Sequence, residues 1–177
     1  MDRRRWLIGS GVATAVLYAA LVVLERKLTD AGGASIVGFE LAGSEGRAAE
    51  IVAEWGASGR DYARASLWID YPFMLAYGTF LTMAALATRD FARRHGRAAL
   101  AAAGAVAPFA AAATAGFDAV EDVFLLLVLG GNGGSAGPAI ATAAASVKFL
   151  LLALTIVYLA WGLASRLRLR RAVGEAA

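Results

Sequence analysis

Long apolar runs constrain this chain more than any other feature. Four segments are long enough for a helix that crosses a bilayer, which takes about 20 apolar residues. They cover residues 6–25, 67–88, 98–130 and 139–165. Backbone groups inside a bilayer core must be hydrogen-bonded internally, so such runs predict helices. We therefore expect an all-α fold, a four-transmembrane-helix bundle that forms a single integral membrane domain over residues 1–177.

The composition agrees with a lipid bilayer as the main partner. Hydrophobic residues make up 59% of the chain and charged residues 18%, against roughly 25% charged in ordinary soluble domains. The absence of Cys excludes disulfides and thiolate metal sites, and a single His argues against a His-rich metal site. The net charge is only +3 and the arginines gather at the ends of the apolar runs, so no nucleic acid partner is expected.

The distribution of basic residues predicts the orientation. The two chain ends and the loop between the second and third runs hold eleven arginines, whereas the loop at 26–66 holds five basic residues mixed with acids. Under the positive-inside rule both termini are cytoplasmic and residues 26–66 are extracytoplasmic. The first run has 19 uncharged residues, which is long for the apolar part of a signal peptide, and it predicts a retained anchor. Together with an Ala- and Arg-rich composition, this predicts a multi-pass protein of a bacterial inner (plasma) membrane.

The loop between the first two runs contains a second kind of helix signal. Ala48, Ile51, Val52 and Trp55 recur at helical spacing, with charged residues between them. This pattern predicts an extracytoplasmic amphipathic helix within 45–66. It fits either a helix lying on the outer membrane surface or a cap packed over the bundle.

Charged residues inside the apolar runs mark the candidate site. Asp118, Glu121 and Asp122 stand at i, i+3 and i+4, so they share one helix face. Counted from the outer helix ends, Glu121, Lys148 and Tyr77 all lie roughly 14 Å deep. Buried charges are costly and mark functional sites by default. We expect a polar site in the outer half of the bundle, lined by six residues: Asp70, Tyr77, Asp118, Glu121, Asp122 and Lys148.

The numbers of acids and bases leave two interpretations of this site. Lys148 paired with Glu121 or Asp122 would be structural, a polar link between helices. Three acids on one face against one lysine leave acids in surplus, however, and these require a proton or a cation. If a metal binds, Mg²⁺ held by Asp118, Glu121 and Asp122 is the expected form. On this argument Asp118→Asn should leave folding intact or improve it.

Most of the chain resembles a group of small, uncharacterised four-span bacterial membrane proteins. The shared pattern runs from Phe39-Glu40-Leu41-Ala42-Gly43 through Asp70-Tyr71-Pro72-Phe73 and Asp118-x-x-Glu121-Asp122 to Lys148. In that group the third helix carries D-x-x-E-N, so Asp122 replaces an asparagine and adds a negative charge. The resemblance implies a topology and no activity.

Two main functions are compatible with these features. One is a membrane enzyme or binding protein for a lipid or isoprenoid-like molecule. Asp118 and Glu121 would then act as acid and base, Asp70 and Asp122 would support them, and Lys148 would be a charge partner or phosphate contact. The other is a proton- or cation-coupled transporter, which with four helices would require a homo-oligomer; an accessory structural subunit is a third possibility. A cavity that opens sideways between helices would favour the first function, and an axial polar path the second.

Overall fold

The computed structural model describes residues 3–174, and within that range the regular elements are all helices. This confirms the all-α class. The elements are α1 (Arg3–Asp30), α2 (Ile36–Glu40), α3 (Glu45–Glu54), α4 (Gly56–Arg94), α5 (Ala98–Ala103), α6 (Ala107–Leu129) and α7 (Gly137–Gly174).

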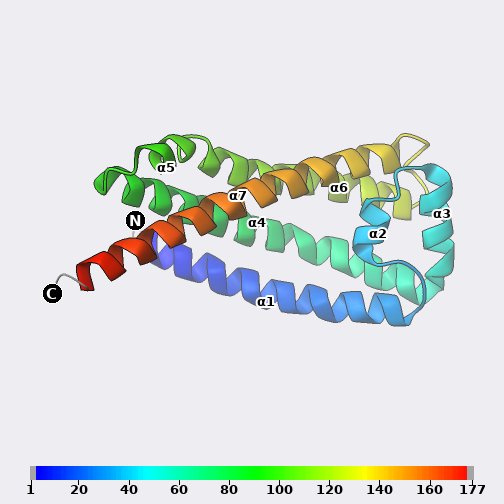
Figure 1. Cartoon of the computed structure of the whole chain (residues 1–177). Coiled ribbons are helices and arrows are strands. Elements are labelled where there is room, and N and C mark those ends of the chain that lie inside the picture. The colour runs from blue at the N-terminus through cyan, green and yellow to red at the C-terminus, as the bar shows by residue number, and fades with distance from the viewer. Residues whose placement is uncertain (1–2, 175–177) are drawn as a thin grey trace.

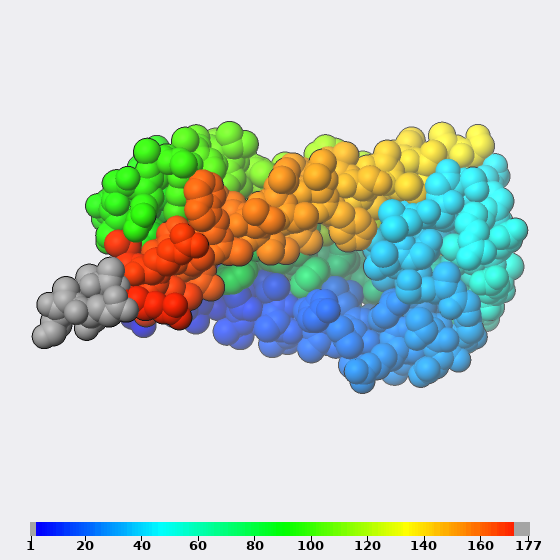
Figure 2. Space-filling model, in the orientation of Figure 1, coloured from blue at the N-terminus to red at the C-terminus, as the bar shows by residue number. Residues whose placement is uncertain are grey.

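Helix α4 lies at the centre of the arrangement. It packs against α1 on one side and α6 on another, and α7 packs mainly along α6 (Figure 1). The short helices α2 and α3 close one end of the bundle, which we call the capped end. The start of α1, the end of α4 and the last turns of α7 meet at the other, which we call the basic end because their arginines gather there (Figure 1). Between the ridges formed by α1 and α7, α4 is recessed from the surface (Figure 2).

Three segments are long and apolar enough to cross a membrane: Arg3–Asp30, Ala98–Leu129 and Gly137–Arg171. Their large apolar side chains point outward in many places, as at Val16, Leu150 and Val157, which is the surface that lipid would cover. The chain is therefore a helical protein with three candidate membrane spans that favour contact with a bilayer.

The expected span at 67–88 lies inside α4 and is not among these three segments. Asp70, Tyr71 and Tyr77 make this stretch less apolar than the other three runs. The central position of α4 explains that composition, because much of its surface faces other helices, and a helix covered by its neighbours needs fewer apolar residues than one surrounded by lipid.

The expected span at 98–130 is divided into α5 and α6, with a turn at 104–106 between them. Pro108 lies in the first turn of α6, where its missing N–H costs no hydrogen bond. At Gly104 a Cβ atom would lie 2.5 Å from the Tyr158 hydroxyl and 2.8 Å from Cβ of Arg89. The break thus occurs where the chain passes too close to α4 and α7 for any side chain.

The amphipathic segment at 45–66 forms α3 and the start of α4. Ser44 caps α3 by accepting a hydrogen bond from the backbone N–H of Arg47 at 3.3 Å. Ile51 and Trp55 are only 1% exposed, and they pack in a core that also contains Leu28 and Leu129. Of the two interpretations of this helix, the packed cap is therefore the one that the structure supports.

Candidate functional site: a buried acidic cluster

Three acids on α6 form the centre of the site. Asp118, Glu121 and Asp122 are 3%, 0% and 2% exposed, as expected from their positions on one helix face. The same face carries the buried small residues Ala111 and Thr114, which let α4 come close. At Gly78 of α4, a Cβ atom would lie 2.9 Å from Cβ of Ala115. The small residues thus allow the close packing that buries the acids.

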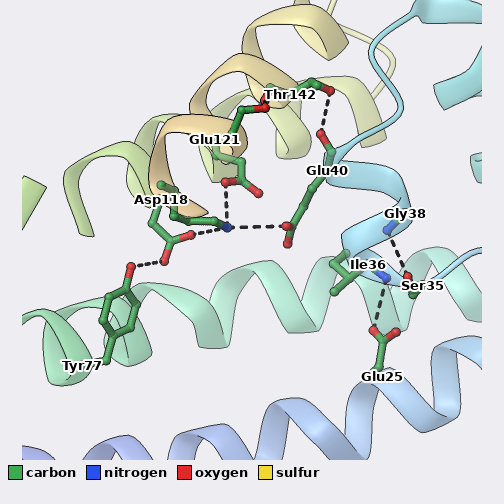
Figure 3. Close-up of polar contacts among 11 residues, drawn as sticks. Glu25, Ser35, Ile36, Gly38, Glu40, Tyr77, Asp118, Glu121 and Thr142 are labelled. Atoms are coloured by element: carbon green, nitrogen blue, oxygen red, sulfur yellow. Dashed lines mark hydrogen bonds and ion pairs between the residues drawn. The ribbon is translucent and has the colours of Figure 1, made fainter. Parts of the chain in front are cut away.

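Lys148 of α7 is surrounded by carboxylates. Figure 3 shows the side chains of Asp118, Glu121 and Glu40 pointing toward one another. Its ammonium nitrogen lies 2.9 Å from Oδ1 of Asp118, 2.7 Å from Oε2 of Glu121 and 3.5 Å from Oε2 of Glu40. The charge of Lys148 is thus shared among three acids on two other helices, and this arrangement links α2, α6 and α7.

Glu40 is a member of the site that the charge pattern did not identify. It ends α2, and its backbone carbonyl accepts a hydrogen bond from the Thr142 hydroxyl at 2.7 Å (Figure 3). The same hydroxyl accepts from the backbone N–H of Gly43 at 2.9 Å. These two bonds fasten the α2 segment to α7 and direct Glu40 toward Lys148. Its sequence signals were a lone acid between the apolar residues Phe39 and Leu41 and its place in the shared pattern described above.

Both oxygens of Asp118 are already engaged. The Tyr77 hydroxyl of α4 donates to Oδ2 at 2.7 Å, while Oδ1 accepts from Lys148 (Figure 3). Tyr77 therefore does meet the acids of α6 as expected. Asp118 is fixed between a phenol and an ammonium group, which leaves it poorly placed to act as a free base.

Asp70 and Asp122 form the part of the site that Lys148 does not neutralise. Asp70, Asp118 and Asp122 each offer one carboxylate oxygen within 4.8 Å of the other two. Oδ2 of Asp122 is buried and has no hydrogen-bond partner among the described residues. Such an arrangement of carboxylates suits a hard divalent cation that keeps some of its waters. This group shares Asp118 and Asp122 with the expected Mg²⁺ ligand set, and it contains Asp70 in place of Glu121.

A cavity of about 300 Å³ lies next to this unneutralised pair. It lies between α1, α2 and α4, near the capped end. Its walls are largely apolar and include Tyr18 and Phe73, whose rings stack at 6.2 Å between centroids. Its acidic part is formed by Asp70, Asp122 and Glu40 together with Glu25. Asp118, Glu121 and Lys148 do not line this cavity.

The geometry thus separates the six expected site residues into two groups. Tyr77, Asp118, Glu121 and Lys148 form a connected polar network, and Asp70 and Asp122 border the cavity. Comparison with protein-family models, curated proteins and solved structures finds no match to this chain. The resemblance to four-span bacterial membrane proteins therefore stays a prediction.

Proposed function

We propose that this protein is a four-span membrane protein that binds an amphiphilic molecule with a basic, amine-type head group. The observation that carries the proposal is the cavity between α1, α2 and α4. It combines apolar and aromatic walls with a buried oxygen of Asp122 that has no hydrogen-bond partner among the described residues. An apolar tail would lie along the walls toward the lipid, and a cationic head would be held by Asp122 and Asp70.

The fourth span in this proposal is α4. It packs against α1 and α6, each of which belongs to a candidate span, so it occupies the same layer. It also carries outward-facing apolar side chains, Trp68 and Leu75 among them, at 60% and 71% exposure. Four antiparallel spans put both chain ends on one side, the cytoplasmic side of a bacterial inner membrane by the positive-inside rule.

The charges around the cavity favour a cation over an anion as the head group. Lys148, the one buried base of the site, is already contacted by Asp118, Glu121 and Glu40. A phosphate entering the cavity would meet carboxylates before it met this ammonium group. Aromatic rings such as Tyr18 and Phe73 attract organic cations through their negatively charged faces. The expected role of Lys148 as a phosphate contact therefore has no support in the geometry, and its role as a charge partner has.

The same geometry favours binding over acid–base catalysis by Asp118 and Glu121. Neither residue borders the cavity, and both contact Lys148. Any proton exchanged with a bound molecule would pass through one of the four acids that line the cavity, Glu25, Glu40, Asp70 or Asp122.

The three-aspartate group supports a second candidate, a cation-binding function of the kind that a cation-coupled transporter needs. Asp70, Asp118 and Asp122 could hold Mg²⁺ without any organic ligand. This candidate makes no use of the apolar walls, which is why the amphiphile is preferred.

The test is a binding measurement on the full chain in nanodiscs of zwitterionic lipid. The probes are a long-chain alkylamine, the alcohol and the carboxylate of equal chain length, and Mg²⁺. The variants are Asp122→Asn and, as a matched control, Asp61→Asn, an exposed acid on α4 that pairs with Arg64. We expect the amine alone among the alkyl probes to raise the melting temperature, and we expect Asp122→Asn to abolish that effect while Asp61→Asn retains it.

Each other outcome has a definite meaning. Equal stabilisation by amine and alcohol would show that the acids do not select the head group, which contradicts the proposal. Retention of the amine effect in Asp122→Asn would do the same. Stabilisation by Mg²⁺ but not by the amine would replace the proposal with the cation-binding candidate.

A further inference from the structure

A second cavity lies at the basic end, away from the acidic cluster. It has a volume of about 820 Å³ and lies between the start of α1, the end of α4 and the last turns of α7. Five arginines line it, namely Arg3, Arg4, Arg94, Arg166 and Arg170. In sequence these residues belong to three separate clusters, and the fold brings them around one space.

Among the described residues, a single carboxylate, that of Asp90, lines this cavity, and it pairs with one of the arginines. Asp90 accepts a hydrogen bond from Arg3, which holds the pKa of Asp90 below its usual range. The acid therefore stays ionised and paired with Arg3 at neutral pH. Arg94, Arg166 and Arg170 add further positive charge, so the described lining of the cavity is basic.

Arg166 is held in a fixed position at the cavity wall. Its Nη2 donates to the carbonyl of Ala87 at 3.1 Å, and its guanidinium carbon lies 4.8 Å from the centre of the Phe91 ring. Its Nε is buried and has no hydrogen-bond partner among the described residues. A preorganised guanidinium group at a cavity wall suits the oxygens of a phosphate group.

The surroundings of the cavity indicate the source of that phosphate. Leu7, Phe91 and Leu169 give it apolar sides. Trp6 and Trp161, at 50% and 44% exposure, lie where the apolar helices give way to arginines, the level at which tryptophans gather at membrane interfaces. A cavity at this level, lined by both arginines and apolar side chains, matches a lipid that has a phosphate head and acyl chains.

We propose that the cavity at the basic end binds the phosphate head group of an anionic phospholipid, one molecule per chain. The arginines contact the phosphate, and Leu7 and Phe91 contact the glycerol and the first part of the acyl chains. This site is independent of the amine site proposed at the capped end, since the two cavities share no residue.

The test compares two double variants with equal loss of charge on the same two helices. Arg94→Gln/Arg170→Gln removes two arginines that line the cavity, and Arg93→Gln/Arg168→Gln removes two exposed neighbours that do not. Short-chain phosphatidylglycerol is titrated into the full-length protein in nonionic detergent, with phosphatidylcholine as the neutral lipid. Native mass spectrometry counts bound lipids and thermal melting follows stabilisation.

We expect one tightly held phosphatidylglycerol and no retained phosphatidylcholine. The lining variant should bind phosphatidylglycerol on the order of tenfold more weakly, and the control variant should bind like the wild type. If both double variants bound phosphatidylglycerol equally weakly, the binding would depend on general surface charge. That result would contradict a site in this cavity. Equal stabilisation by inorganic phosphate at matched concentration would overturn the lipid source in favour of a soluble phosphate ligand.

Discussion

At the scale of single residues, Lys148 has the largest expected effect on stability. Its ammonium group contacts Asp118, Glu121 and Glu40, all of them buried. Lys148→Met would leave these acids without a counter-charge, and stranding a buried charge typically costs about 3–5 kcal/mol. We expect a large drop in the melting temperature in detergent. Arg93→Met, on the exposed end of α4, is the control, and equal melting of the two variants would contradict the buried network.

Asp118 and Asp122 should respond in opposite ways to amide substitution. Asp118 accepts from both Tyr77 and Lys148, so Asp118→Asn should lower stability by about 2 kcal/mol, the scale of a charge-assisted hydrogen bond. Asp122 has an oxygen without a partner, so Asp122→Asn should be neutral or stabilising. The measurement is thermal melting of the two variants at one pH. A higher melting temperature for Asp118→Asn than for Asp122→Asn would contradict the hydrogen-bond partners described here.

This pair also shows what the sequence could reveal about the site. Helical spacing correctly placed Asp118, Glu121 and Asp122 on one buried face, because that spacing depends on a single helix. From the sequence alone, Asp118 was expected to be an unpaired charge. In the structure both oxygens of Asp118 have partners, whereas a buried oxygen of Asp122 has none among the described residues. Which acid contacts Lys148 depends on how α7 packs against α6, and the sequence does not show that packing. Glu40 also contacts Lys148, but it belongs to a five-residue helix that is too short to show any periodicity.

At the scale of the elements, close contact between α4 and α7 depends on Gly162. A Cβ atom at this position would lie 2.3 Å from Cγ2 of Thr88, a branched side chain with little freedom to move. Gly162→Ala should therefore lower the free energy of unfolding by about 1–3 kcal/mol. Gly116 on α6 has no atom within 4 Å of such a Cβ, so Gly116→Ala should be neutral or stabilise by about 0.5–1 kcal/mol. Chemical denaturation in mixed micelles measures both, and equal effects would contradict this helix contact.

The helical class of the elements was predictable from the sequence, but their number and limits were not. Four spans and one amphipathic helix were expected, and the described residues form seven helices. The apolar runs predicted the positions of the long helices, because the composition of a segment depends on whether lipid surrounds that segment. The same runs did not reveal that α4 extends from Gly56 to Arg94, well beyond 67–88, or that a turn separates α5 from α6. Those limits depend on contacts between helices, such as the approach of Tyr158 and Arg89 to Gly104. A pattern within one segment carries no information about such contacts.

At the scale of the whole molecule, acidic side chains gather near one end of the bundle and basic side chains at the other. The long helices between the two ends are apolar. Acids gather in the buried cluster near the capped end, and arginines surround the cavity at the basic end. The long helices between them expose apolar side chains. If both proposals hold, one chain binds a cationic amphiphile near one membrane face and an anionic lipid at the other.

The topology is the prediction on which both proposals depend. If α4 is a span, the loop before α3 and the connection between α6 and α7 lie on one side of the membrane, and both chain ends lie on the other. The chain contains no cysteine, so single cysteines can be introduced at Ser44, at Ser135, at Arg97 and at Ala176, the last of which lies outside the described residues.

An impermeant thiol reagent applied to intact cells should label Ser44→Cys and Ser135→Cys, and it should label Arg97→Cys and Ala176→Cys only after the membrane is opened. Ser44, Ser135 and Arg97 are exposed at the ends of the bundle, so access within the fold does not limit labelling. With only the three most apolar segments as spans, the two ends of the chain would lie on opposite sides. Labelling of Ala176→Cys from outside would therefore contradict α4 as the fourth span, and with it the placement of the acidic cavity inside a membrane.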